Sequence, residues 1–499
     1  MKNRIINIAL LLMSGVSAVS CSGWLDVTSS SKMTDTQLYS TKTGFHEALT
    51  GIYISMTSQD CYGKNYTWGA NDLTCYPTAA VSNPEYTTWK QHIYNNTIAT
   101  GAFTSMWRAG YNVIANINKF LDKLEHNGVI TDEEEFALLR GEAMGLRAYV
   151  MFDMLRMFGR DSWYGENAEK RTIPYPLVYT KDVHPQQTYK DAAKLLHDDI
   201  EGALECLKND PVTGGASDRF EQELNADGYW SNRTKHFNYY AALALAARVA
   251  MWEGDYAAAA QKAQEVIDGS VANGAVAWVD AEAIVKETNS DKRDWNLSSE
   301  HLFSLDVTDL YSIIREYYYS IDVNGNIFLD PLAADMLFAN EGGYLSGAED
   351  IRGTALWLDY TSMGYKINKY YSSTGYYSGY RNRIAMIRLS EMYYIIAETK
   401  LRHGDMDGFI SSVDEVRRHR GISVSIAEDA LPEGSTSDDA FALLEAEYVK
   451  EFVGEGRLFF FYKRLGKLPK HIFVNNVDYS GKLMYPYPTA ETSYGRVQD

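Results

Sequence analysis

Cysteine, histidine and the common catalytic motifs are scarce in this chain. Its 499 residues include 4 cysteines and 10 histidines, and the histidines lack the spacing of metal ligands. The sequence also has no H-E-x-x-H, no glycine loop of the Walker type, no G-x-S-x-G and no C-x-x-C. These absences argue against zinc hydrolases, P-loop enzymes, α/β-hydrolases and thiol oxidoreductases. A glycosidase pair of carboxylates stays open, because acidic residues are plentiful.

Positive charge is also in short supply. The chain has 47 Lys and Arg against 66 Asp and Glu, which gives a net charge of −19. Its pI is near 5.0. Because the phosphates of nucleic acids require a basic surface, this balance argues against a nucleic-acid partner.

Long apolar runs are absent beyond the N-terminus. The run from Ile5 to Val19 follows Lys2 and Arg4, and it is too short and wrongly flanked for a transmembrane helix. We therefore expect residues 1–20 to be a secretory signal peptide. The small residues before Cys21 resemble a lipobox, and cleavage there would free Cys21 for acylation. Acylation would anchor an otherwise soluble protein to a membrane.

The remaining cysteines do not define a disulfide framework. Cys61 and Cys75 lie in one aromatic-rich segment and could pair in an oxidising compartment, but the sequence alone leaves this open. Cys206 falls within a helical pattern, where we expect a small buried apolar residue.

Aromatic residues, in contrast, are abundant. They make up 13% of the chain, and Tyr, at 37, is as frequent as Gly. Tyrosine-rich surfaces suit neutral polar ligands, because the ring stacks and the hydroxyl forms hydrogen bonds. The alternative is that most of these rings fill the seams between helices.

Apolar residues recur at spacings of three and four along most of the chain, which predicts amphipathic helices. The predicted helical parts are residues 33–58, 103–268 and 384–466. Two alanine-rich or amphipathic pairs of helices turn at Gly254-Asp255 and at Gly404-Asp405, like the hairpins of tetratricopeptide repeats. We predict a mainly α fold, with a tetratricopeptide-like hairpin scaffold in a single domain over residues 21–499.

Two long segments, residues 59–102 and 269–383, lack this helical period. Loops of such length are usually functional or disordered, and their many aromatic residues argue against disorder. We interpret them as irregular insertions that lie on the helical scaffold and bind the ligand.

The densest pattern covers residues 437–466. An apolar stripe follows one face of its helix, and the other face is charged, with Glu445, Glu447 and Lys450. Two glycines then allow a sharp turn, at Gly454 and Gly456. This turn can bring Glu451, Glu455 and Arg457 together, either as a buried ion-paired corner or as a catalytic carboxylate pair.

The same stretch resembles the C-terminal signature of the SusD/RagB family, the outer-membrane nutrient-binding lipoproteins of Bacteroidetes. The resemblance rests on E-x-x-x-E-G-R from Glu451 to Arg457, followed by aromatic residues and Lys-Arg-x-Gly. Further matches occur in order along the chain: L-R-A to F-G at residues 146–159, R-L-S-E to R-x-R-G at 388–421, and the proline pair near 486–488 with Glu491. Arg147 within the first of these is expected to pair with an acidic residue such as Glu142.

This resemblance implies a SusD-like α-α superhelix and a role in binding rather than catalysis. It implies a surface lipoprotein of the outer membrane, anchored through Cys21, that captures glycans and passes them to a SusC-like TonB-dependent transporter. No metal or other cofactor is expected. Two alternatives remain: binding of an oligopeptide or another nutrient, and a secreted glycoside hydrolase.

Aromatic residues outside the helical period are the candidates for ligand contact. We predict that Trp68 and Trp89 stack on sugar rings, that Asn71 and Asp72 bond hydroxyl groups, and that Trp295 or Tyr318 closes the other side. The full set of predicted ligand-binding residues is Tyr66, Trp68, Asn71, Asp72, Trp89, Trp295 and Tyr318. The alternative for each Trp is that it fastens its loop to the scaffold.

Overall fold

The computed structural model describes most of the chain after residue 33. The described residues are 34–80, 82–214, 219–288, 292–318, 326–338, 349–356, 358–361, 364–367, 369–370, 380, 382–466 and 481–498. The predicted signal peptide and Cys21 lie outside these ranges. Within them, no helix combines the length and the apolar character needed to cross a membrane.

Helices dominate the described residues, which confirms the predicted fold class. The first half contains α2 (Asp35–Leu38), α3 (Lys42–Met56), α4 (Ala70–Cys75), α5 (Pro84–Lys90), α6 (Thr97–Glu125), α7 (Glu133–Phe158) and α8 (Tyr189–Leu207). The second half contains α9 (Tyr239–Glu253), α10 (Tyr256–Ala272), α11 (Ala281–Lys286), α12 (Leu310–Tyr318), α13 (Pro331–Phe338), α14 (Leu389–Arg402), α15 (Met406–Arg418), α16 (Ile426–Asp429), α17 (Ser437–Glu451), α18 (Arg457–Leu465) and α19 (Thr489–Ser493).

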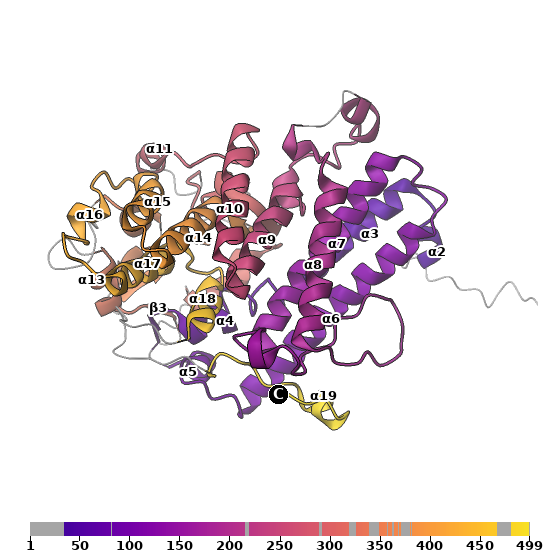
Figure 1. Ribbon diagram of the computed structural model, residues 1–499, viewed down its shortest axis with the longest axis horizontal. Helices are drawn as coiled ribbons and strands as arrows, with labels where there is room; N and C mark the ends of the chain where they lie inside the picture. Colours follow the sequence, from indigo (N-terminus) through magenta and orange to yellow (C-terminus); the bar gives the residue numbers. More distant parts are fainter. Residues whose placement is uncertain are drawn as a thin grey trace, which may run out of the picture.

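The long helices form one array of antiparallel neighbours. In Figure 1 the array runs from α3, α6, α7 and α8 on the right, through α9 and α10, to α14 and α15 on the left. Both predicted hairpins are present. Gly254 and Gly404 adopt the left-handed φ angles of 81° and 77° that turn each hairpin, and the aspartate that follows each glycine caps the second helix.

Two small sheets lie beside the array. Strands β1 (Thr78–Ala79), β3 (Phe328–Leu329), β5 (Gly364–Ile367) and β4 (Leu358–Thr361) form an antiparallel sheet in the order β1-β3-β5-β4. Strands β2 (His301–Asp306) and β6 (Arg383–Arg388) form a second antiparallel pair. Both sheets use strands from the segment 269–383, so this segment is more regular than its sequence pattern predicts.

The first segment predicted to be irregular also contains helices. Asn83 caps α5 by accepting from the backbone N–H of Tyr86, and Pro84 occupies the first turn of that helix. Helix α6 begins at Thr97, with Asn96 as its cap. Helices α4 and α5 are too short to show a stripe, and the stripe of α6 indicates a helix only from residue 103.

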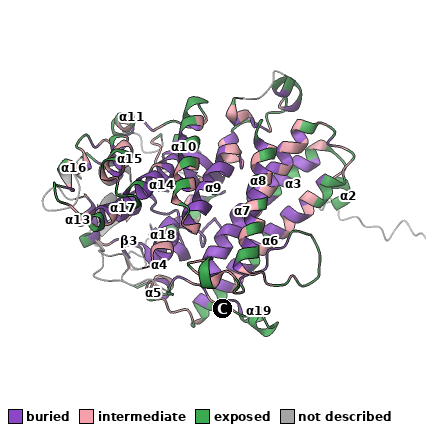
Figure 2. Ribbon diagram, viewed as in Figure 1, coloured by how far each residue is buried: buried purple, intermediate pink, exposed green. Residues whose placement is uncertain are grey.

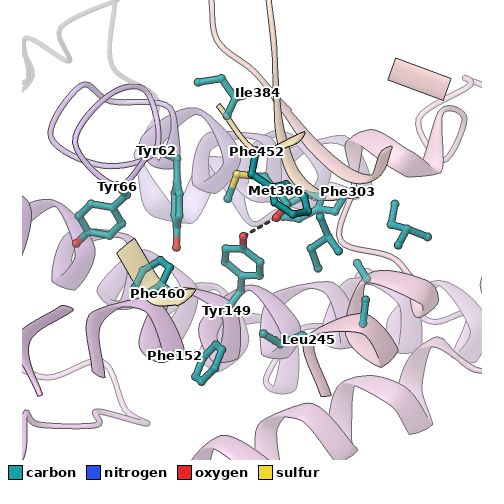
Figure 3. Close-up of a cluster of buried hydrophobic side chains, with 14 of the residues drawn as sticks. Tyr62, Tyr66, Tyr149, Phe152, Leu245, Phe303, Ile384, Met386, Phe452 and Phe460 are labelled. Atoms are coloured by element: carbon teal, nitrogen blue, oxygen red, sulfur yellow. Dashed lines mark hydrogen bonds between the residues drawn. The ribbon is translucent and has the colours of Figure 1, made fainter. Parts of the chain in front are cut away.

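The core follows the helix array and continues under the sheets. Helices α9, α14 and α17 are buried along most of their length, whereas α8 and α10 carry exposed residues on their outer faces (Figure 2). Tyr149 of α7 lies in the middle of this core (Figure 3). Its hydroxyl donates to the carbonyl of Met386 on β6 over 3.0 Å, so the polar group is satisfied inside an aromatic cluster.

A buried ion cluster fixes the C-terminal signature. Its acidic members are Glu300, Asp350, Glu447, Glu451 and Glu455, and its basic members are Arg352, Lys369, Arg388, Arg417, Arg420 and Lys450. Each is at most 2% exposed. The charged face of α17 therefore faces the interior rather than solvent: Arg352 pairs with Glu447, Asp350 pairs with Lys450, and the Tyr462 hydroxyl donates to Glu445.

Within this cluster, Glu451 and Glu455 converge as predicted. Arg388 donates through Nη1 to Glu451 over 2.6 Å and through Nε to Glu455 over 2.9 Å. Arg457 turns away and donates to the Tyr149 hydroxyl over 2.8 Å. These contacts support the ion-paired corner over a catalytic pair, because both carboxylates are buried and already bound to cations.

The structure corrects one predicted ion pair and settles one pairing that the sequence left open. Arg147 pairs with Asp199 on α8, with Nε at 2.8 Å from the carboxylate, and not with Glu142. Positions 142 and 147 lie five residues apart on α7, about 140° around the helix, and Glu142 instead accepts from Arg233. Cys61 and Cys75 are free and buried separately, and burial raises the pKa of both thiols.

Candidate ligand-binding site

The two segments predicted to bind ligand meet in space. Strand β1 of the first pairs with β3 of the second, with Thr78 opposite Leu329. The ring of Trp68 packs edge-on against Tyr317 and Tyr318, with ring centroids 5.3 Å and 6.1 Å apart. We call this region the loop junction, defined as residues 59–96 together with α12 and β3.

The predicted stacking residues lie inside the loop junction rather than on its surface. Trp68 is 1% exposed and donates through its indole N–H to the Gly63 carbonyl over 2.9 Å. Trp89 is fully buried against Phe103 and Tyr485. Neither ring has a face free for a sugar in this structure, which supports the alternative that each Trp fastens its loop to the scaffold.

The predicted polar contacts are also occupied. Asn71 donates to the Tyr66 carbonyl over 3.0 Å, and its carbonyl oxygen accepts from the Tyr485 hydroxyl over 3.0 Å. Asp72 accepts from the backbone N–H groups of Gly454 and Gly456, over 2.6 Å and 2.9 Å. Burial raises the pKa of Asp72 to about 7. These two side chains therefore hold the first segment against the C-terminal signature.

The remaining predicted residues divide between two places. The Tyr66 hydroxyl donates to the Met106 carbonyl over 2.8 Å, and Tyr318 is 6% exposed beside Trp68. Trp295 is half-buried, with the Arg293 guanidinium 4.9 Å from its ring. Arg293 lines a separate polar hollow of about 520 Å³ near α11. Trp295 thus belongs to a different surface from the other six.

Four side chains outside the predicted ligand-binding set lie next to one another at the edge of the junction: Lys64, Glu85, Tyr86 and Tyr317. Lys64 lies 2.8 Å from Glu85 and donates to the Tyr317 hydroxyl over 2.5 Å. Tyr317, Glu85 and Tyr86 are half-buried, so each keeps part of its side chain in solvent. Together they place aromatic rings next to charged groups, with Lys64 Nζ 4.2 Å from the centre of the Tyr317 ring. Partly exposed rings beside hydrogen-bonding groups suit a neutral polar ligand.

A larger hollow lies elsewhere, between α6, the segment 174–184 and the C-terminal residues. We call it the aromatic cleft; its volume is about 660 Å³, and its lining includes Trp107, Arg108, Tyr111, Asn112, Tyr179 and Tyr494. The Tyr111 hydroxyl donates to the Pro174 carbonyl over 2.8 Å, which fixes the segment beside α6. Tyr179 and Tyr494 are 55% and 80% exposed.

The aromatic cleft leaves no recognisable pattern in the sequence. Trp107 and Tyr111 fit the helical stripe of α6, so their pattern predicts packing alone. Tyr179 and Tyr494 lie far apart in the chain and in no shared motif. One sequence feature does point to this surface: Arg108 and Asn112 are polar residues four apart, so they lie on one face of a helix.

Among the described residues, no group of three or more His, Cys, Asp or Glu side chains is arranged to hold a metal ion. The structure therefore presents two regions with ligand-binding chemistry, the loop junction and the aromatic cleft.

Comparisons with known proteins agree with this fold. Residues 23–216 match a SusD-like family model described as starch-binding and associating with the outer membrane, and residues 343–498 match the SusD family model. No curated protein is similar enough to match the chain.

Solved structures resemble most of the chain. A SusD superfamily protein from Bacteroides vulgatus has a TM-score of 0.69 at 19% identity, over 92% of this chain and 98% of that chain. A SusD superfamily protein from Bacteroides thetaiotaomicron has a TM-score of 0.63 at 20% identity, over 90% and 97%. A SusD-like carbohydrate binding protein from Bacteroides vulgatus has a TM-score of 0.66 at 15% identity, over 90% and 96%. The helical fold, the two family models and these relatives agree, and the chain belongs to the SusD/RagB family.

Proposed function

We propose that the chain is a cell-surface lipoprotein that binds oligosaccharides at the loop junction and delivers them to a SusC-like TonB-dependent transporter. The observation that carries the site is the meeting of two tyrosine-rich segments, distant in sequence, around Lys64, Glu85 and Tyr317. Half-buried rings next to charged groups favour a neutral polyhydroxyl ligand over an apolar one. An oligopeptide or another nutrient is the alternative ligand, and a glycan array run beside a peptide pool separates the two.

We expect the ligand to be bound without turnover. The carboxylates of the signature are buried and paired with arginines, so they have no access to a glycosidic bond. Prolonged incubation of the pure protein with oligosaccharides should leave their lengths unchanged. New reducing ends in such a sample would instead support a glycoside hydrolase.

Tyr317→Ala should weaken oligosaccharide binding by about tenfold. This factor corresponds to roughly 1.4 kcal/mol of binding free energy, which is the size of loss seen when one stacking ring is removed. The melting temperature should fall by much less than in Trp68→Ala, because the Tyr317 ring is half-buried and Lys64 keeps its ion pair with Glu85. Isothermal titration calorimetry with the best array ligand measures the effect. Tyr179→Ala is the matched control in the aromatic cleft; if it weakens binding while Tyr317→Ala does not, the ligand site is the cleft.

Cys21→Ala should release the protein from the membrane. A single acylated residue would be the anchor, and without it the rest of the chain has no lipid attachment. Fractionation of cells that express either form, with detection by antibody, provides the measurement. An equal amount of the variant in the outer-membrane fraction would contradict the anchor.

Co-purification should recover a TonB-dependent barrel with the protein. Delivery of ligand requires that the two proteins lie in contact, and extraction in mild detergent preserves such complexes. We expect mass spectrometry of the eluate to identify a SusC-like transporter, with a tagged unrelated lipoprotein as the control. Repeated recovery of the protein alone would argue against delivery to a transporter.

A further inference from the structure

A small cavity lies away from both ligand-binding regions, where five helices converge. Its volume is about 50 Å³, and it is lined from α7, α9, α14, α17 and α18. Four of the lining residues are arginines: Arg156, Arg248, Arg457 and Arg464. Such a cavity is several times larger than the minimum for one water molecule and far too small for a sugar.

The arginines outnumber the carboxylates that neutralise them. Arg156 pairs with Asp153, Arg248 with Glu391, and Arg464 with Glu398. Glu398 is shared with a further cation, Arg402. Arg457 donates to the neutral hydroxyl of Tyr149. The group therefore carries excess positive charge in a region where each lining arginine is nearly buried.

Some of the buried donors around the cavity lack partners. Nε and Nη1 of Arg457, and Nε of Arg156, have no hydrogen-bond acceptor among the described residues, although all three atoms are buried. An unsatisfied buried donor on a charged group is costly, so an acceptor is expected beside them. Both side chains line the cavity.

The arginines are held rigidly in place. The guanidinium of Arg156 lies between two rings, 3.8 Å from the centroid of Phe152 and 3.7 Å from that of Phe460. This sandwich fixes the plane of the group and leaves its edge for hydrogen bonds. Burial and the neighbouring cations Arg457 and Arg248 lower the pKa of Arg156 to about 10, as expected where like charges are crowded.

We propose that this cavity binds a small monovalent inorganic anion, of the halide class, between Arg156 and Arg457. A water molecule would accept hydrogen bonds but would leave the excess charge uncompensated in a medium of low dielectric constant. A halide ion satisfies the donors and neutralises the charge together. The bound anion would link α7 to α18, and so join the helix array to the C-terminal signature.

Crystals of the full mature chain soaked in sodium bromide test the site directly. We expect an anomalous scattering peak within hydrogen-bonding distance of Arg457 Nη1 and Arg156 Nε. Density for water alone in that cavity, with no anomalous signal, would overturn the proposal. This measurement uses the unaltered protein and does not depend on whether a variant folds.

Thermal unfolding supplies the second test. At equal ionic strength, the melting temperature should be higher in chloride than in gluconate, which is too large for the cavity, by about 2 °C or more in a saturable manner. Arg457→Gln should abolish this difference. Arg140→Gln, which removes a partly exposed cation from α7 that pairs with Glu125, should preserve it. Equal melting temperatures of the unaltered protein in the two salts would count against the anion.

Discussion

Glu451→Gln should destabilise the protein by about 3–5 kcal/mol, the usual loss when one partner of a buried ion pair is removed. Glu451 is fully buried and accepts from three arginines: Arg352 over 2.9 Å, Arg388 over 2.6 Å and Arg420 over 2.6 Å. The amide keeps the shape of the side chain but leaves these cations without their shared countercharge. Denaturation with urea, followed by circular dichroism, measures the change in the free energy of unfolding.

Asp438→Asn is the matched control for this variant. It makes the same carboxyl-to-amide change in the first turn of the same helix, at an exposed position, and should alter stability by less than about 0.5 kcal/mol. Similar effects of the two substitutions would mean that the buried ion cluster contributes little to stability.

The pH dependence of stability, compared between the unaltered protein and Glu451→Gln, adds a further readout. Against the cost of burial, Arg420 and Arg388 hold the pKa of Glu451 well below its ordinary value of 4.5. A carboxyl whose pKa is depressed by folding stabilises the protein fully above its unfolded pKa and loses that contribution as the pH falls toward its folded pKa. The stability gap between the unaltered protein and Glu451→Gln should therefore narrow as the pH falls below about 4.5.

The sequence predicted this corner because its signals are local. Glycines at 454 and 456 and acidic residues at 451 and 455 stand close together in the chain, and the helix before them shows its stripe. The sequence does not reveal that the charged face of α17 is buried as well as the apolar one. That burial depends on Asp350, Arg352 and Arg420, which come from distant segments and carry no pattern that links them to α17.

The ligand-binding region was predictable as a pair of segments but not residue by residue. Lack of helical period and richness in aromatics located both segments, and they do meet at the loop junction. Which rings face solvent depends on how the short turns of residues 57–69 fold over the helix array. The backbone N–H groups there are satisfied by near neighbours, as in Gly63 to Ser58 and Tyr66 to Cys61. Such turns leave no periodic trace in a sequence.

Trp68→Ala tests that distinction between fastening a loop and binding a ligand. A fully buried Trp replaced by Ala typically lowers the free energy of unfolding by about 3–5 kcal/mol, because a cavity replaces the ring. Here the substitution also leaves the Gly63 carbonyl without its indole donor and removes the ring that packs against Tyr317 and Tyr318. We therefore expect a large fall in melting temperature, measured by differential scanning calorimetry.

The matched control is Tyr179→Ala, which removes an aromatic ring that is 55% exposed and should change stability by less than about 0.5 kcal/mol. If Trp68→Ala kept the melting temperature of the unaltered protein but weakened oligosaccharide binding tenfold, Trp68 would be a stacking platform that opens to the ligand. If it unfolds the protein instead, the ring fastens the first segment to α12. In that case the half-buried Tyr86 and Tyr317 are the residues that contact ligand at the loop junction. Binding of the same array ligand to variants of these two residues measures their contribution.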